Sequence, residues 1–242
     1  AVRERLPVHV LSVFSHPHRN SFSGALLDSF VRGVADAGHT SEIADLYRED
    51  FNPVMSQRDL QQFDNVVMPD DVLREQARVE RSDALCFIFP IWWYSMPAMI
   101  KGWLDRVWSA GWAYQPAYIP EGSLLDSRPC TLLVPTGATP SHMEQWRYDQ
   151  EIDHVWRYGV LGYCGVDPIR IHFLLDSQED TGKGTHAAHL QTKFSSGEDA
   201  MPSKWLISAD SHVIEPPNLY AKALTDKHGD AVPREVAEWQ GQ

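Results

Sequence analysis

A turn of large aromatic side chains follows an apolar run, and these residue types suit the binding of a flat ring. Residues 84–89 are apolar throughout, as in a strand buried on both faces, and Pro90 ends the run because proline cannot donate to a sheet. Trp92, Trp93 and Tyr94 come directly after it. Three adjacent rings cannot all face one way from a strand or a helix, so some must point outward. The stretch predicts a ring-binding surface, with plain core packing as the alternative.

A helix is expected after this turn. Pro97 is tolerated in a first helical turn, and apolar residues then recur at helical spacing as far as Val107. Because only Ser95 is clearly polar between residues 84 and 100, a membrane span is a second alternative. The segment has 17 residues and two prolines, however, and Asp83 and Lys101 bracket it, which argues against a span.

The first apolar run, residues 8–14, leads into a polar turn with the features of a phosphate-binding loop. Ser21 or Ser23 can cap a helix that Gly38 closes. The unpaired N–H groups and the dipole at the start of such a helix favour an anion. Further donors in the turn are His16, Arg19, Asn20 and Ser21. An ordinary capped loop is the alternative interpretation, because the turn has no glycine fingerprint.

The remaining pattern alternates strands with helices, which predicts a doubly wound, five-stranded parallel sheet with helices on both faces. Further strands are expected at residues 41–47, 131–134 and 169–175, helices at 72–81, 143–162 and 185–193, and an irregular passage at 52–71. In the strand order 2-1-3-4-5, the loops after the first, third and fourth strands meet at one edge. The last of these loops, residues 135–142, is small and hydroxyl-rich, so a flat ligand can approach its backbone. A phosphate cradle beside two such loops predicts a flavin nucleotide site.

Charge and cysteine content exclude several classes of protein. The net charge of −12, from 33 acidic and 21 basic residues, argues against binding to nucleic acid or to an anionic membrane surface. Three widely spaced cysteines, Cys86, Cys130 and Cys164, fit a reducing compartment better than a disulfide scaffold. No export signal is visible near the N-terminus, and a cytoplasmic location is therefore expected.

Three motifs together resemble the flavodoxin-like NAD(P)H:quinone oxidoreductases. They are His-Pro-x-x-x-Ser-Phe at residues 16–22, the long and specific stretch at residues 89–107, and Thr-Gly at residues 136–137. The resemblance covers roughly residues 7–195. It implies a flavodoxin-like fold, FAD (or FMN) as cofactor, and a homodimer with the active site at its interface. It also implies that a hydride passes from NAD(P)H to flavin N5 and then to a quinone or a similar flat acceptor.

The resemblance also assigns cofactor contacts residue by residue. It implies that three residues of the first turn hold the phosphates and the adenosine half, namely His16, Ser21 and Phe22. It implies that the isoalloxazine ring is lined by two further groups, namely Pro90, Ile91, Trp92, Trp93 and Tyr94 from one turn and Thr136, Gly137 and Ala138 from the other.

One departure from the family pattern concerns catalysis. The family places a Tyr after the Thr-Gly loop and a His six residues later, where they stabilise the charge of reduced flavin. An ungapped match lands on Met143 and Asp149, which are unsuited to that task. If the loop is one residue shorter, the positions become His142 and Tyr148, with the residue types exchanged. Either side chain can donate to a developing negative charge. Two surface residues without a role are the alternative.

The character of the sequence changes near Pro202, and a flavin-binding domain over residues 1–200 with an extension over residues 201–242 is therefore expected. The extension resembles the first strand of a metal-dependent amidohydrolase, with Asp210 and His212 matching its Asp-x-His motif. The barrel that would complete such a site needs about 200 further residues. No metal site is therefore expected, and the segment is read as vestigial or structural.

Other functions remain open from the sequence. An azo-, nitro- or flavin reductase would use the same aromatic pocket. A non-catalytic regulatory partner of other proteins belongs to a different class, as does a truncated hydrolase fused to a flavodoxin-like domain. Bound flavin that NAD(P)H reduces would separate the enzyme from the other classes.

Overall fold

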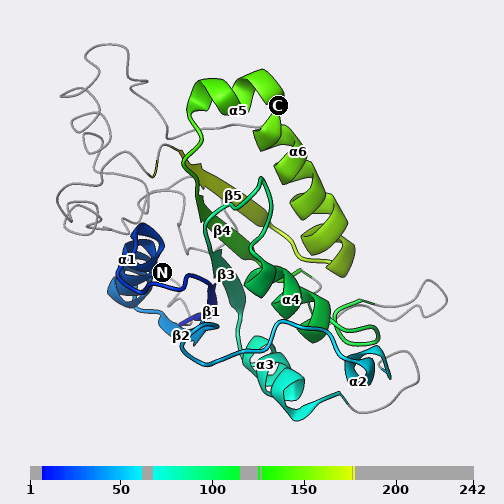
Figure 1. Ribbon diagram of the computed structural model, residues 1–242. Coiled ribbons are helices and arrows are strands. Elements are labelled where there is room, and N and C mark those ends of the chain that lie inside the picture. The colour runs from blue at the N-terminus through cyan, green and yellow to red at the C-terminus, as the bar shows by residue number, and fades with distance from the viewer. Residues whose placement is uncertain (1–6, 62–67, 115–124, 126, 176, 178–242) are drawn as a thin grey trace.

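The computed structural model describes residues 7–61, 68–114, 125, 127–175 and 177, and a parallel β-sheet lies at its centre (Figure 1). The strands are β1 (His9–Phe14), β2 (Thr40–Asp45), β3 (Ala84–Ile88), β4 (Cys130–Pro135) and β5 (Ile169–Leu174). Neighbouring strands are all parallel, and their order in the sheet is β2-β1-β3-β4-β5. The predicted α/β fold and strand order are confirmed.

Helices lie on both sides of this sheet (Figure 1). On one face, α1 (Phe22–Asp36) packs its Leu27 and Phe30 against Val10 and Ile88 of the strands. On the other face lie α3 (Asp70–Glu80), α4 (Ala98–Val107) and α6 (Tyr148–His154). Alternate strand residues such as Leu11 and Phe87 belong to this second core. The two-residue period of the strands therefore divides the core into two layers.

The three cysteines are core residues. Cys86 belongs to the α1-side core and Cys130 to the opposite one, and all three cysteines are free and buried. Burial raises the pKa of the Cys86 and Cys130 thiols well above the ordinary range and that of Cys164 to about 12. Thiols with such high pKa values are unreactive near neutral pH.

Helix α1 begins and ends as the sequence predicts. Of the two candidate caps, Ser21 is the one used, and its Oγ accepts a hydrogen bond from the Gly24 N–H at 3.2 Å. Ser23 instead lies buried in the first turn. Gly38, with φ of +79°, follows the C-cap in the left-handed conformation that glycine adopts without strain.

The prediction of one helix over residues 143–162 is wrong. Helix α5 (Pro140–Trp146) ends at Arg147, whose φ of +55° is left-handed, and α6 begins at the next residue. The chain continues as a π-helix, η2 (Val155–Leu161), and a 3₁₀ turn, η3 (Gly162–Cys164). A left-handed arginine carries no sequence signal, because this conformation is typical of glycine.

In the described part of the passage over residues 52–71, a short helix, α2 (Gln57–Leu60), begins at a Ser56–Asp59 capping box. No helix in the described ranges has the length and apolar character needed to cross a membrane. The helix expected at 185–193 and the residues Asp210 and His212 lie outside the described residues.

Candidate functional site

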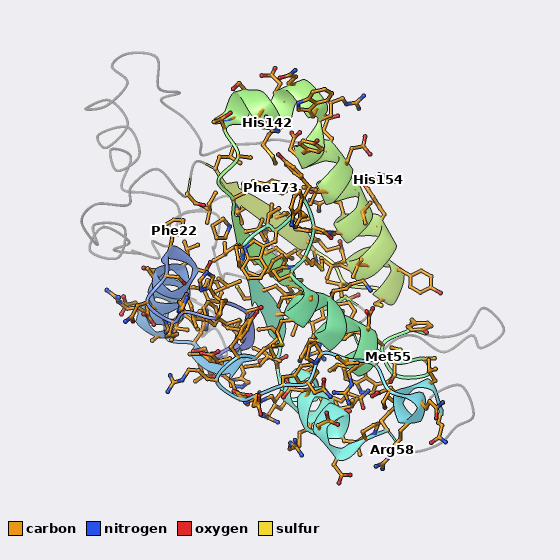
Figure 2. The ribbon with its side chains drawn as sticks, viewed as in Figure 1. Phe22, Met55, Arg58, His142, His154 and Phe173 are labelled. Carbon is orange, nitrogen blue, oxygen red and sulfur yellow. The ribbon has the colours of Figure 1, made fainter. Side chains whose placement is uncertain are left out.

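The turns after β1, β3 and β4 lie side by side at the carboxyl edge of the sheet. Past the end of β1, the Ser15 N–H donates to the Ile88 carbonyl at 3.1 Å. Past the end of β3, the Ile91 N–H donates to the Pro135 carbonyl at 2.9 Å. Figure 2 shows Phe22 at the start of α1 and His142 on α5 toward the same end of the sheet. Ligands of open α/β sheets bind at this edge, where neighbouring strands lead into opposite faces.

The first turn contacts the aromatic turn through His16. The ring centroids of His16 and Trp92 are 6.4 Å apart. His16 Nδ1 lies 3.0 Å from the N–H and 2.8 Å from the carbonyl oxygen of His18, so the tautomer decides which bond forms. Burial lowers the pKa of His16; the hydrogen bond with the His18 backbone opposes this shift, and the His18 charge adds to it. The surroundings of His16 therefore favour its neutral form.

The first turn also packs tightly against the start of α1. A Cβ atom at Gly24 would lie 1.9 Å from the Arg19 carbonyl oxygen, so only glycine permits this approach. Arg19 itself donates to the Gly24 carbonyl at 2.9 Å and pairs with Asp28, with a 3.2 Å contact. Arg19 was predicted as one of the further donors in this turn, and its guanidinium lies against α1. The capping hydroxyl and the backbone N–H groups of the first helical turn remain as the anion-binding features.

The aromatic turn is a hairpin-like bend that holds its two tryptophan rings outward. Trp92 and Ser95 exchange backbone hydrogen bonds of 3.2 and 3.1 Å, while Trp93 and Tyr94 have φ of +52° and +55°. Non-glycine residues in this region cost about 1–3 kcal/mol each and concentrate at functional sites. Trp93 is 97% exposed and Trp92 42% exposed, whereas Ile91 is buried. Core packing is thus the wrong interpretation for these two tryptophans, and the predicted outward orientation is confirmed.

The proposed catalytic pair comes together at this turn. The rings of Tyr94 and Tyr148 are stacked, with centroids 3.7 Å apart and an interplanar angle of 25°. The His142 ring centroid lies 6.1 Å from that of Tyr94 and 5.9 Å from that of Tyr148. His142 lies in the first turn of α5, Arg147 breaks the helix, and Tyr148 is the first residue of α6. Two residues that the sequence could relate only through a shortened loop are therefore neighbours in space.

The loop after β4 is held by its own hydroxyls. The buried Thr136 accepts from the Ala138 N–H at 3.2 Å, and Thr139 caps α5 by accepting from the His142 N–H at 3.1 Å. Gly137, between them, is exposed. The loop therefore presents backbone rather than bulky side chains toward the edge.

These features fit a ligand with an anionic part and a flat ring. Donors at the start of α1 lie on one side of the edge and neutral aromatic rings on the other. Ser15, a site residue that no sequence pattern indicates, has a hydroxyl that is buried at this edge and has no hydrogen-bond partner. A bound molecule can supply the hydrogen-bond partner that such a buried hydroxyl lacks. Within the described part of the chain, no group of three or more His, Cys, Asp or Glu side chains is arranged to hold a metal.

Comparisons with known proteins agree with this arrangement. The chain matches the family model described as "Flavodoxin-like fold" over residues 8–194. It is 28% identical over 167 residues to an uncharacterized NAD(P)H oxidoreductase of Haemophilus influenzae, covering 69% of this chain and 83% of that protein. It is 27% identical over 205 residues to the human ribosyldihydronicotinamide dehydrogenase [quinone], covering 75% of this chain and 89% of that protein.

A solved structure is also similar. The NAD(P)H:quinone oxidoreductase from Methanothermobacter marburgensis superposes with a TM-score of 0.67 at 34% sequence identity, covering 76% of this chain and 91% of that one. The match of fold, sequence and strand-end turns leads to one conclusion: the chain belongs to the flavodoxin-like NAD(P)H:quinone oxidoreductase family.

Proposed function

We propose that this protein is an enzyme that transfers two electrons from NAD(P)H to a quinone, or to a similar flat acceptor, through a bound flavin. The observation that carries the proposal is the convergence of a capped helix start and an outward-facing aromatic turn at one sheet edge. The relatives with the printed names NAD(P)H oxidoreductase and quinone oxidoreductase support the reaction class. A bound flavin would supply the hydride chemistry, and the protein would orient it and its partners.

The cofactor is proposed to be FAD, with its polar half at the first turn. His16, Ser21 and Phe22 would contact the phosphates and the adenosine part, because Ser21 caps α1, Phe22 begins it and His16 lies in the turn before it, where a helix start favours an anion. The isoalloxazine would lie against the turns of β3 and β4. The residues proposed to line it are Pro90, Ile91, Trp92, Trp93 and Tyr94 with Thr136, Gly137 and Ala138.

His142 and Tyr148 are proposed to donate hydrogen bonds to the negative charge that develops on the ring. Their side chains lie beside Tyr94, a ring-lining candidate, which supports a shared role. Donors that are fixed in a water-poor site stabilise such charge most effectively. Replacing both with phenylalanine should slow anaerobic flavin reduction by NADPH by about 100-fold. A double variant that reduces its flavin at the wild-type rate would rule the pair out.

The active form is proposed to be a cytoplasmic homodimer, with residues 201–242 as an extension outside the flavin-binding domain. Several large apolar side chains on the described surface are exposed and would suit an interface; they are Trp93, Trp146, Val155, Tyr158 and Tyr163. Sedimentation of the full chain across a range of concentrations would measure its oligomeric state, and a monomer at all concentrations would contradict the dimer.

The absorbance of the purified protein and the mass of its extracted cofactor test the proposed function. The purified protein should show flavin absorbance that bleaches when NAD(P)H is added anaerobically and returns when a quinone follows. Mass spectrometry of the extracted cofactor should give FAD. A colourless protein that neither FAD nor FMN restores would contradict the proposed function and favour a binding role.

A further inference from the structure

Two serines of the first strand region carry buried hydroxyls without partners. Ser12 is fully buried and Ser15 is 1% exposed, and neither Oγ has a hydrogen-bond partner. The backbone around them is satisfied, since the Ser15 N–H donates to Ile88. A buried hydroxyl that has given up water and gained no partner destabilises the folded protein. Each serine is therefore expected to have a role that offsets this cost.

The two positions differ in what lies beside them. Ser12 is in the middle of β1, paired in register with Ile43 of β2 and Cys86 of β3. It lies within the sheet, away from the strand ends. Ser15 lies just past the carboxyl end of β1 and directly before His16, at the edge where the strand-end turns meet. Only Ser15 is next to the proposed phosphate-binding turn.

We infer that the Ser15 hydroxyl is a further cofactor contact, which donates a hydrogen bond to the phosphate or ribityl oxygens of the bound flavin nucleotide. This inference rests on the proposed function. A hydroxyl rotates freely about its Cα–Cβ bond, so it can turn toward an oxygen that arrives at the edge. The Ser15 Oγ is covered by protein atoms, so those atoms must move aside for a nucleotide oxygen to reach it. The contact would give the buried hydroxyl the hydrogen-bond partner that it lacks within the protein.

Ser12 provides a matched control for the experiment. Flavin-free protein is prepared as wild type, Ser15→Ala and Ser12→Ala, and each is titrated with FAD and with FMN while flavin fluorescence is followed. The S15A variant should bind the preferred flavin about 10-fold more weakly, because it loses a hydrogen bond to a polar or charged oxygen. The S12A variant should bind as the wild type does.

Thermal unfolding of the flavin-free proteins separates this role from a structural one. Both variants should unfold at the wild-type temperature or above it, since each loses an unpaired buried hydroxyl. Wild-type affinity in S15A would overturn the inference while leaving the proposed function intact. An equal loss of affinity in S12A, or a lower unfolding temperature for flavin-free S15A, would also overturn it. A wild-type protein that binds neither flavin would instead overturn the proposed function, and the inference with it.

Discussion

The two ends of α4 are built in opposite ways. Before its first turn, the chain holds Trp93 and Tyr94 in left-handed conformations, with the Trp93 ring almost fully exposed. At its last turn, Arg106 is buried and donates to Asp59 at 3.0 Å and to Asp71 at 2.7 Å. The open end, at Trp93 and Tyr94, has a strained backbone and an exposed ring. The closed end, at Arg106, is held by the ion pairs of that residue with Asp59 and Asp71. In Figure 2, the residues Met55 and Arg58, from the segment next to this closed end, lie far from His142.

This difference shows where the molecule is stabilised and where it is free to bind. Arg106 also donates to the Asn52 carbonyl at 2.7 Å, and Gly102 lets the Pro53 carbonyl approach the helix closely. The segment over residues 52–61 is thereby fixed to α4. The open end has no such contacts between the Trp93 ring and the core. We therefore expect substitutions at the closed end to change stability, and those at the open end to change binding and turnover.

The largest effect is expected from Arg106→Met. It leaves the Asp59 carboxylate, which is fully buried, without its cationic partner, and breaking a buried pair in this way costs about 3–5 kcal/mol. Urea denaturation measures the loss. Lys101→Ala on the same helix is the control, because its exposed pair with Asp105 is worth about 0–1 kcal/mol. Equal effects of the two variants would contradict the stabilising role of the closed end.

A smaller loss is expected from Gly102→Ala. The new Cβ would lie 2.1 Å from the Pro53 carbonyl oxygen, so the segment must move, at a cost of about 1–3 kcal/mol. Gly159→Ala is its control, since nothing lies within 4 Å of a Cβ there. That variant should keep or slightly raise the free energy of unfolding. If both alanines behave alike, the tight contact is not what fixes the segment.

Acid should weaken the closed end selectively. Burial acts to raise the pKa of Asp59, but hydrogen bonds from Ser56 and Arg106 outweigh it, and the pKa falls below the usual 3.8. The Arg106 hydrogen bond lowers the pKa of Asp71 as well, against its burial. The stability gained from these carboxylates is present above about pH 4 and is lost as the pH falls through their folded-state values. The free energies of unfolding of wild type and R106M, measured as a function of pH, should therefore converge below about pH 4. A difference between them that does not change with pH would contradict the stabilising role of these carboxylates.

The smallest change in stability is expected at the open end, from Trp93→Gly. Glycine relieves the left-handed conformation, and the exposed ring contributes no packing, so the unfolding free energy should rise by about 1 kcal/mol or stay level. Quinone turnover should fall at the same time, if the ring serves the acceptor or the flavin. Trp93→Ala keeps the strained backbone and separates the two effects. A large loss of stability in W93G would show that the open end also stabilises the fold.

The sequence predicted what local patterns control. Apolar runs and their alternation with helices predicted a five-stranded parallel sheet, and hydroxyls before the first helix predicted a cap at Ser21 or Ser23. Contacts between distant segments could not be read in this way. Asp59 and Arg106 are 47 residues apart, and nothing in either neighbourhood predicts their pairing. The helix break at Arg147 and the capture of Arg19 by Asp28 were missed for the same reason, since each depends on the folded surroundings.

The central claim is that a flavin is held by the turns at the carboxyl edge and not elsewhere. Two-dimensional NMR of the flavin-free protein, titrated with FAD, tests it most directly. The amide signals of residues 15–24, 91–95 and 136–142 should shift together, while those of Asp59, Gly102 and Arg106 at the closed end of α4 stay in place. Shifts centred on the closed end, or the absence of any shift at the three turns, would contradict the account.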